Sequence, residues 1–208
     1  MLRNQFSIAL CPLLLVANIA IASEYMSYGG GFQVDDCNRN NVNNPITGTL
    51  SCPWGTWAYW SGRARGPESR CGSNQYMCLG YGYSQSGSWG FGGMFQIDDC
   101  GRNNVGNSLY WNWLACPTGF GAYRVARVTA SESKCGATQY ACISPYGGSQ
   151  WATPAGTFQI DDCATNNRPN PFSGGLYCPP GHYARPYGRV KGSEGDKCGV
   201  WQYVCTSW

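Results

Sequence analysis

Three pairs of adjacent carboxylates are the residues whose types and spacing first suggest chemistry. Each pair precedes a cysteine, and the pairs are Asp35 and Asp36, Asp98 and Asp99, and Asp161 and Asp162. Two carboxylates that converge on one substrate atom can act as general acid and general base. Each pair, however, ends a stretch of alternating apolar and polar residues that is typical of a β-strand, where neighbouring side chains point to opposite faces. We therefore do not expect catalytic dyads.

A structural role explains the paired carboxylates better. An arginine recurs downstream of each pair, as Arg63, Arg127 and Arg189. Aspartate accepts hydrogen bonds from nearby backbone amides in turns. We expect one carboxylate of each pair to hold a turn and the other to form a salt bridge with the arginine. The alternative is a calcium site built from Asp and Asn oxygens, although the spacing matches no EF-hand loop.

Other signals of catalysis are missing from the sequence. It contains one histidine, His182, and no Gly-x-Ser-x-Gly, His-Glu-x-x-His or phosphate-binding motif. A zinc site would need clustered Cys or His pairs, which a single histidine makes improbable. We predict a protein that is not an enzyme and has no cofactor, apart from the calcium alternative.

A threefold internal repeat organises the whole chain. Phe-Gln-[Val/Ile]-Asp-Asp-Cys occurs at 32–37, 95–100 and 158–163, so its period is 63 residues. Each occurrence is followed by Cys-Pro-x-Gly and by Cys-Gly-x-x-Gln-Tyr-x-Cys. A period of this length indicates copies of one supersecondary unit. We predict copies at 23–80, 81–146 and 147–208, together forming one compact domain.

The predicted fold class is all-β. The Phe-Gln segments alternate as strands do, and Gly, Pro and Asn interrupt every segment that could form a helix. An open solenoid needs altered end copies with a polar outer face, but the first and last copies here keep every marker. We therefore favour a closed, pseudo-threefold arrangement resembling a prism of three sheets. Three separate beads on a string are the alternative.

The amino terminus has the pattern of a secretory signal peptide. Residues 1–22 contain one positive residue, an apolar run and the small-x-small sequence Ala20-Ile21-Ala22. No later apolar stretch is long enough to span a bilayer. We expect a secreted, extracellular protein without a transmembrane segment.

The cysteine count fits that compartment. One of the 13 cysteines, Cys11, lies in the predicted signal peptide, which leaves four in each copy. An even number in a secreted chain indicates disulfides, and four cysteines allow three pairings. The simplest pairing joins the first to the second and the third to the fourth: Cys37–Cys52, Cys71–Cys78, Cys100–Cys116, Cys135–Cys142, Cys163–Cys178 and Cys198–Cys205.

Aromatic residues are the strongest candidates for binding. They make up 14% of the chain, whereas the charges are scattered and nearly balanced, which argues against a nucleic-acid partner. Aromatic residues that differ between the copies are Trp54, Trp57 and Trp60 in the first, Tyr110, Trp111 and Trp113 in the second, and Phe172, Tyr183 and Tyr187 in the third. If exposed, these rings could stack on sugars or contact a partner protein. The alternative is that they form the core of a leucine-poor protein.

The repeated Gly-Gly-x-Phe-Gln-x-Asp-Asp, Cys-Pro-x-Gly and Cys-Gly-x-x-Gln-Tyr-x-Cys markers resemble those of cysteine-rich β repeats in secreted invertebrate and protist proteins. Some of these repeats are similar to the threefold β-sheet modules attached to perforin-like proteins, which are thought to recognise membranes or glycans. The resemblance covers the whole mature chain. It implies a recognition module only, because no pore-forming domain is present.

Two functions are consistent with these features. The preferred one is a secreted, lectin-like binding protein with up to three related sites for a glycan or an extracellular protein surface. The alternative is a structural component of an extracellular matrix, shell, coat or filament, in which disulfides provide durability and the chain associates with itself.

Overall fold

The computed structural model describes residues 26–65, 71–81, 90–129, 135–144, 152–164, 167–191 and 198–207. The predicted signal peptide lies outside these ranges. The described residues form nine β-strands and no helix, which confirms the all-β class. The strands are β1 (Met26–Asp35), β2 (Trp57–Arg65), β3 (Gly72–Tyr81), β4 (Gly90–Asp98), β5 (Gly121–Thr129), β6 (Gly136–Ser144), β7 (Pro154–Asp161), β8 (Tyr183–Lys191) and β9 (Gly199–Thr206).

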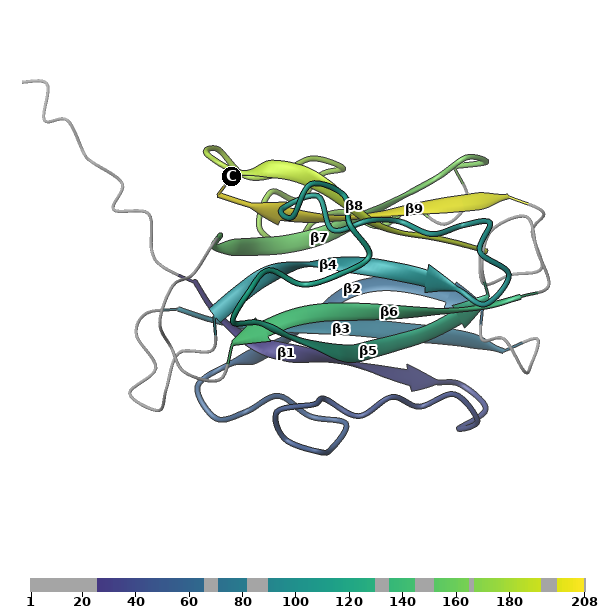
Figure 1. Cartoon of the computed structure of the whole chain (residues 1–208), viewed down its shortest axis with the longest axis horizontal. Helices are drawn as coiled ribbons and strands as arrows, with labels where there is room; N and C mark the ends of the chain where they lie inside the picture. Colours follow the sequence, from purple (N-terminus) through teal and green to yellow (C-terminus); the bar gives the residue numbers. More distant parts are fainter. Residues whose placement is uncertain are drawn as a thin grey trace, which may run out of the picture.

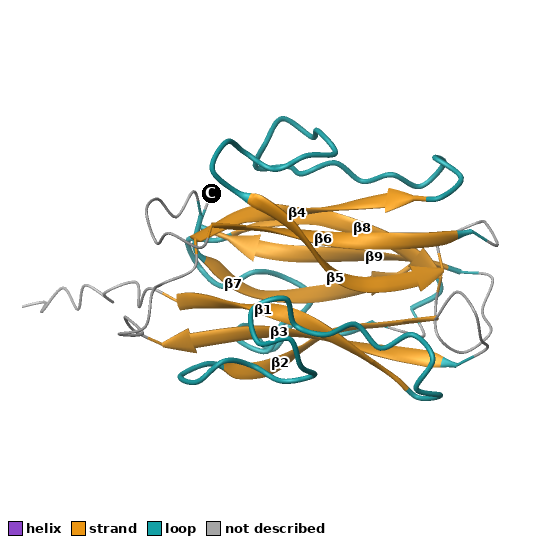
Figure 2. Cartoon of the chain, turned by 60° about the horizontal axis from the view of Figure 1, so that its bottom comes forward, coloured by secondary structure: helices purple, strands orange, loops and turns teal. Residues whose placement is uncertain are grey.

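Each predicted copy forms one antiparallel sheet of three strands. The strand orders are β1-β3-β2, β4-β6-β5 and β7-β9-β8, so the third strand of every copy lies in the middle. The segment Cys-Gly-x-x-Gln-Tyr-x-Cys supplies this central strand. Figure 1 shows the three sheets in successive colour ranges, and Figure 2 shows the long connections, in teal, on the outside of the strands.

The three sheets close into a ring. Strand β1 packs against β5 of the second sheet, β4 packs against β8 of the third, and β7 packs against β2 of the first. Each contact joins the first strand of one copy to the second strand of the next. This cyclic pattern confirms the closed, prism-like arrangement and excludes three separate beads.

The interior contains two apolar clusters contributed by all three sheets. The larger is aromatic and includes Tyr28, Phe91, Phe158 and Tyr187. The smaller consists of alanine and valine, such as Ala64, Val128 and Val190. On each central strand, β3, β6 and β9, one inward-facing position faces the larger cluster and another faces the smaller one. The inward-facing residue between them is a glutamine. The core of this protein therefore contains a polar layer between two apolar ones.

Six buried glutamines form this polar layer, two from each sheet: Gln33, Gln75, Gln96, Gln139, Gln159 and Gln202. Those of the three central strands form a closed hydrogen-bonded ring. Gln75 donates to Gln139, Gln139 to Gln202, and Gln202 back to Gln75, with donor–acceptor distances of 2.5 to 2.9 Å. Glycines at 62 and 188 leave room for the ring, because a Cβ there would collide with its amides.

The other three glutamines join neighbouring sheets. Gln33 on β1 donates to the carbonyl of Arg127 on β5 at 2.8 Å and accepts from its amide at 3.1 Å. Gln96 donates to the carbonyl of Arg189 at 3.0 Å, and Gln159 accepts from the amide of Arg63 at 3.1 Å. Where two sheets meet, hydrogen bonds from a glutamine side chain to the neighbouring backbone therefore replace the backbone–backbone hydrogen bonds found within a sheet. A buried polar network of this kind specifies one arrangement of the sheets.

Of the three possible disulfide pairings, the simplest is wrong. In every copy the first cysteine pairs with the third and the second with the fourth: Cys37–Cys71, Cys52–Cys78, Cys100–Cys135, Cys116–Cys142, Cys163–Cys198 and Cys178–Cys205. Strand β3 begins directly after Cys71 and contains Cys78. Seven extended residues span about 23 Å, far beyond the reach of a disulfide. The crossed pairing instead attaches the long connection of each copy to both ends of its central strand.

Candidate functional site

The paired carboxylates have the structural role that the sequence predicts. Buried Asp35 accepts a hydrogen bond from the amide of Cys37 at 2.8 Å and another from the hydroxyl of Ser73 at 2.7 Å. Its neighbour Asp36 is exposed and forms a salt bridge with Arg63. The second and third copies repeat this division, with salt bridges Asp99–Arg127 and Asp162–Arg189. In each pair, one carboxylate holds the turn and the other fixes an arginine on the outer surface.

Two of these carboxyl groups have shifted pKa values. Burial by itself raises the pKa of Asp35, but its hydrogen bonds from Ser73, Cys37 and neighbouring residues together hold the pKa below its usual range. The hydrogen bond from Arg127 lowers the pKa of Asp99. Both shifts favour the ionised form of the group that makes the turn or the salt bridge.

The same turns bring an aspartate close to two cysteines, as in Asp35, Cys37 and Cys71. The two sulfur atoms are bonded to each other, so they are not thiolate ligands. The oxygens of Asp35 already accept internal hydrogen bonds. A calcium ion at these turns therefore stays a prediction. The hydrogen-bond donors around Asp35 do not favour it, because its oxygens already accept their hydrogen bonds.

The aromatic candidates are mostly on the surface. Trp54 is 89% exposed, Trp111 76% and Trp113 59%; Trp57 and Tyr183 are also more than half exposed, and Trp60 is partly so. Tyr187 is the exception, and its assignment as a binding residue is wrong. A register irregularity between Pro186 and Gly188 turns Tyr187 inward, where it belongs to the aromatic core.

The exposed rings do not form three equivalent sites. Strand pairing places Trp57 opposite Leu79, and the equivalent positions in the other copies are Gly121 and Tyr183. Trp60 is matched by Arg124 and Pro186. The copies share the scaffold but differ in the residues they expose, so any binding sites on them differ in chemistry.

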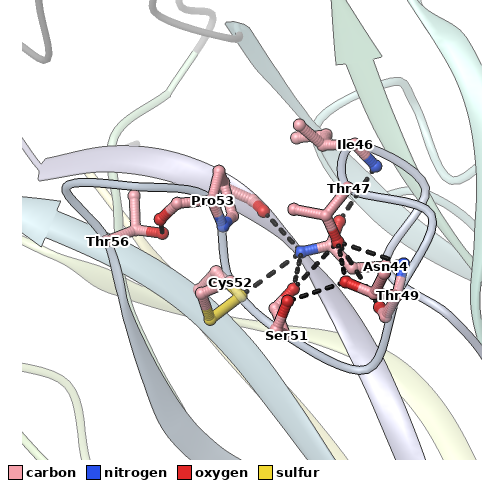
Figure 3. The surroundings of a disulfide bond; sticks show 10 residues. Asn44, Ile46, Thr47, Thr49, Ser51, Cys52, Pro53 and Thr56 are labelled. Carbon is pink, nitrogen blue, oxygen red and sulfur yellow. Dashed lines mark hydrogen bonds between the residues drawn. A yellow bond between two sulfur atoms is a disulfide. The ribbon is translucent and has the colours of Figure 1, made fainter.

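A buried asparagine organises the long connection of each copy. In the first, Asn44 donates to the carbonyls of Gly29 and Ser51 and to the sulfur of Cys78, and accepts from the amide of Ile46. Figure 3 shows these contacts around the disulfide. Asn107 makes the corresponding contacts in the second copy with Gly92, Ala115, Cys142 and Leu109, and Asn170 is its counterpart in the third.

The second copy departs from the others directly after this asparagine. Its stretch from asparagine to cysteine, 107–116, is one residue longer than 44–52 and 170–178. In the first and third copies the turn has a glycine with positive φ, Gly48 and Gly174. In the second, Trp111 and Asn112 adopt positive φ values of 50° and 60°. A left-handed conformation costs about 1–2 kcal/mol for a residue other than glycine, so this turn exposes a tryptophan at an energetic cost.

The rings on this turn form one cluster, which we call the aromatic loop: Tyr110, Trp111 and Trp113. Tyr110 lies 5.3 Å from Trp111 and 5.5 Å from Trp113 between ring centroids, and the two tryptophans are 6.4 Å apart. The backbone is held by hydrogen bonds from the amides of Tyr110 and Asn112 to the carbonyl of Asn107. Leu109 packs against the core. The aromatic loop is thus anchored beneath, while its two tryptophans face solvent.

The structural roles of the six buried glutamines and of the asparagines at 44, 107 and 170 were not predicted from the sequence. Their recurrence at the same place in every copy was the available signal. Alternation predicts that the glutamines lie on the polar face of a strand, but it does not reveal that this face turns inward.

No protein-family model matches this chain, and no curated protein matches it in sequence. Among the described residues, no helix is long and apolar enough to cross a membrane.

Proposed function

We propose that this is a secreted, non-enzymatic recognition protein that binds a glycan through the aromatic loop. The observation that carries the proposal is the left-handed backbone at Trp111 and Asn112, where the other copies have glycine. Strained residues of this kind persist where the surrounding structure holds them, and they cluster at functional sites. Here the strain has the effect of exposing one tryptophan beside a second.

The chemistry of the aromatic loop suits a saccharide. Indole and phenol rings offer flat apolar faces, and the exposed Asn112, which lies between the two tryptophans in the sequence, adds a hydrogen-bonding amide. The disulfide Cys116–Cys142 and the contacts of Asn107 fix the loop to the central strand. A fixed loop loses little conformational entropy when it binds, which improves affinity.

Secretion is part of this proposal. All twelve cysteines of the predicted mature chain are paired, and disulfides of this number form and persist in oxidising compartments. The predicted signal peptide at 1–22 is consistent with that route.

A glycan array probed with the disulfide-intact mature protein tests the function. We expect binding to a defined set of glycans, strongly reduced in Trp111→Ala and Trp113→Ala. Ile97→Ala serves as a matched control, because Ile97 is an exposed apolar residue of β4 away from the loop. Silence of the folded protein across broad arrays would contradict the proposal, as would equal binding by all four proteins.

A structural role in an extracellular matrix or coat is the second candidate. It is favoured by the six disulfides and by exposed rings outside the aromatic loop, including Trp54, Tyr177 and Tyr183. Such rings could join copies of the chain. Extraction of the native protein distinguishes the two functions: release from an insoluble fraction only by reductant supports the structural role, and a freely soluble monomer supports recognition.

A further inference from the structure

A second candidate site lies at the seam between the first and third copies. On β2, a register irregularity between Trp60 and Gly62 changes the alternation of side chains. Trp60 pairs with Tyr76 and Arg63 pairs with Asn74, and residues 74 and 76 of one strand share a face. The bulge therefore places an aromatic ring and a guanidinium on the same outer face of the sheet.

The third copy adds a second guanidinium to this face. Arg168, in the connection after β7, lies 4.4 Å above the ring of Trp60. Its Nε is buried and has no hydrogen-bond partner, and no acidic side chain in the described part of the chain forms a salt bridge with it. Arg63, by contrast, is held by Asp36 and by Asn74, the latter at 2.9 Å. Asp36 therefore balances the charge of Arg63, whereas the charge of Arg168 adds one positive charge to the seam.

These residues line an open cavity of about 470 Å³, formed by Trp60, Arg63, Asn74, Tyr76 and Arg168. The volume is in the usual range for sites that bind small molecules. The lining contains two arginines, an amide and two aromatic rings but no aliphatic side chain. This composition suits a polar, anionic ligand with a flat face more than a lipid tail or an apolar peptide.

The site occurs at only one of the three seams. The positions equivalent to Trp60 are Arg124 and Pro186, from their pairing with Tyr140 and Tyr203. The positions equivalent to Arg168 are Val42 and Val105, each paired by an isolated bridge to a buried glutamine. The scaffold itself requires neither Trp60 nor Arg168, because the other seams close without them.

We propose that this seam binds an acidic saccharide, with the carboxylate or sulfate of the sugar on the Arg168 guanidinium and the sugar ring against the exposed part of Trp60. A guanidinium is planar and donates two parallel hydrogen bonds to a carboxylate or to two oxygens of a sulfate. Arg63 and Asn74 offer further donors at the cavity wall. This site is separate from the aromatic loop and does not depend on it.

Titration calorimetry on the disulfide-intact mature protein tests the proposal. The probes are an oligogalacturonate, a sulfated heparin tetrasaccharide, neutral maltotetraose and inorganic sulfate. We expect saturable binding of at least one acidic oligosaccharide, and the comparison of the two shows which anion is preferred. Arg168→Gln should weaken that binding about tenfold, the usual scale for losing one hydrogen bond to a charged group. Trp60→Ala should also weaken it.

Arg124→Gln is the matched control, because it removes one positive charge at the position of the second copy that is equivalent to Trp60; it should change affinity less than twofold. Arg168→Lys keeps the charge but not the planar guanidinium, and should give intermediate affinity. Each variant is first checked for an unchanged melting temperature. Equal weakening by Arg168→Gln and Arg124→Gln would overturn the proposal, since only net charge would then matter. Inorganic sulfate binding as tightly as the oligosaccharides would overturn it too.

Discussion

The glutamine ring yields the sharpest prediction of stability. Gln139 donates to Gln96 and Gln202 and accepts from Gln75, so all three partners lose a hydrogen bond in Gln139→Leu. Gln75 and Gln202 each lose their hydrogen bond to Gln139, so the ring is opened. The replacement has a similar size but leaves buried polar atoms without partners.

The expected cost follows from these contacts. Each buried polar atom left unsatisfied costs about 1–3 kcal/mol. Three atoms, one each on Gln75, Gln96 and Gln202, lose their bond to Gln139, which gives about 3–9 kcal/mol, part of which the leucine offsets by its apolar burial. The free energy of unfolding is measured by urea titration of the oxidised protein, followed by near-ultraviolet circular dichroism. Ile97→Val, at an exposed position of β4 in the same sheet, should cost less than about 1 kcal/mol.

The triple variant Gln75→Leu, Gln139→Leu and Gln202→Leu refines the test. Because it removes all three members of the ring together, it leaves fewer orphaned atoms than three single variants do. We expect its cost to be smaller than the sum of the single costs. A Gln139→Leu protein as stable as the wild type, or strictly additive costs, would refute the view that the ring holds the sheets together.

Three further predictions concern the loops and turns. Trp111→Gly should raise the free energy of unfolding by about 1 kcal/mol, because glycine adopts the left-handed conformation without strain, while glycan binding falls; lower stability in urea would contradict this. Limited reduction should open the exposed bridge Cys37–Cys71 and its two equivalents before Cys52–Cys78, because Cys78 is buried. Alkylation and mass spectrometry report the order of opening, and the reverse order would contradict the burial argument. The pKa of Asp35 is lower in the folded protein than in the unfolded chain, so its stabilisation is complete above the ordinary aspartate pKa and is lost as pH falls through the lowered value. Asp35→Asn should therefore flatten the acid limb of a stability–pH curve, and an unchanged limb would count against the role of this carboxylate.

The repeat made most of the fold predictable. The period of 63 residues and the markers kept in the end copies were enough to predict three closed β units. The pairing of the cysteines was not, because it depends on whether Cys71 to Cys78 forms one extended strand or a bend. Once that segment is a central strand, its two cysteines cannot meet, and the crossed pairing follows.

The site was only partly predictable. Tryptophan and tyrosine serve a leucine-poor core as readily as a surface, and composition cannot separate Trp111 from Tyr187. The bulges decide which way each side chain points, and bulges depend on pairing across strands. The seam between Trp60 and Arg168 joins residues 108 positions apart, so it exists only when the ring of sheets is closed.

The account depends on a closed scaffold in which the crossed disulfides fix each long connection, including the aromatic loop, to the central strand of its own sheet. Mass spectrometry of peptides from the unreduced protein tests this directly. It should recover Cys37 with Cys71, Cys52 with Cys78, and the equivalent links in the other two copies. Recovery of Cys71 linked to Cys78, or of bridges between copies, would contradict the account.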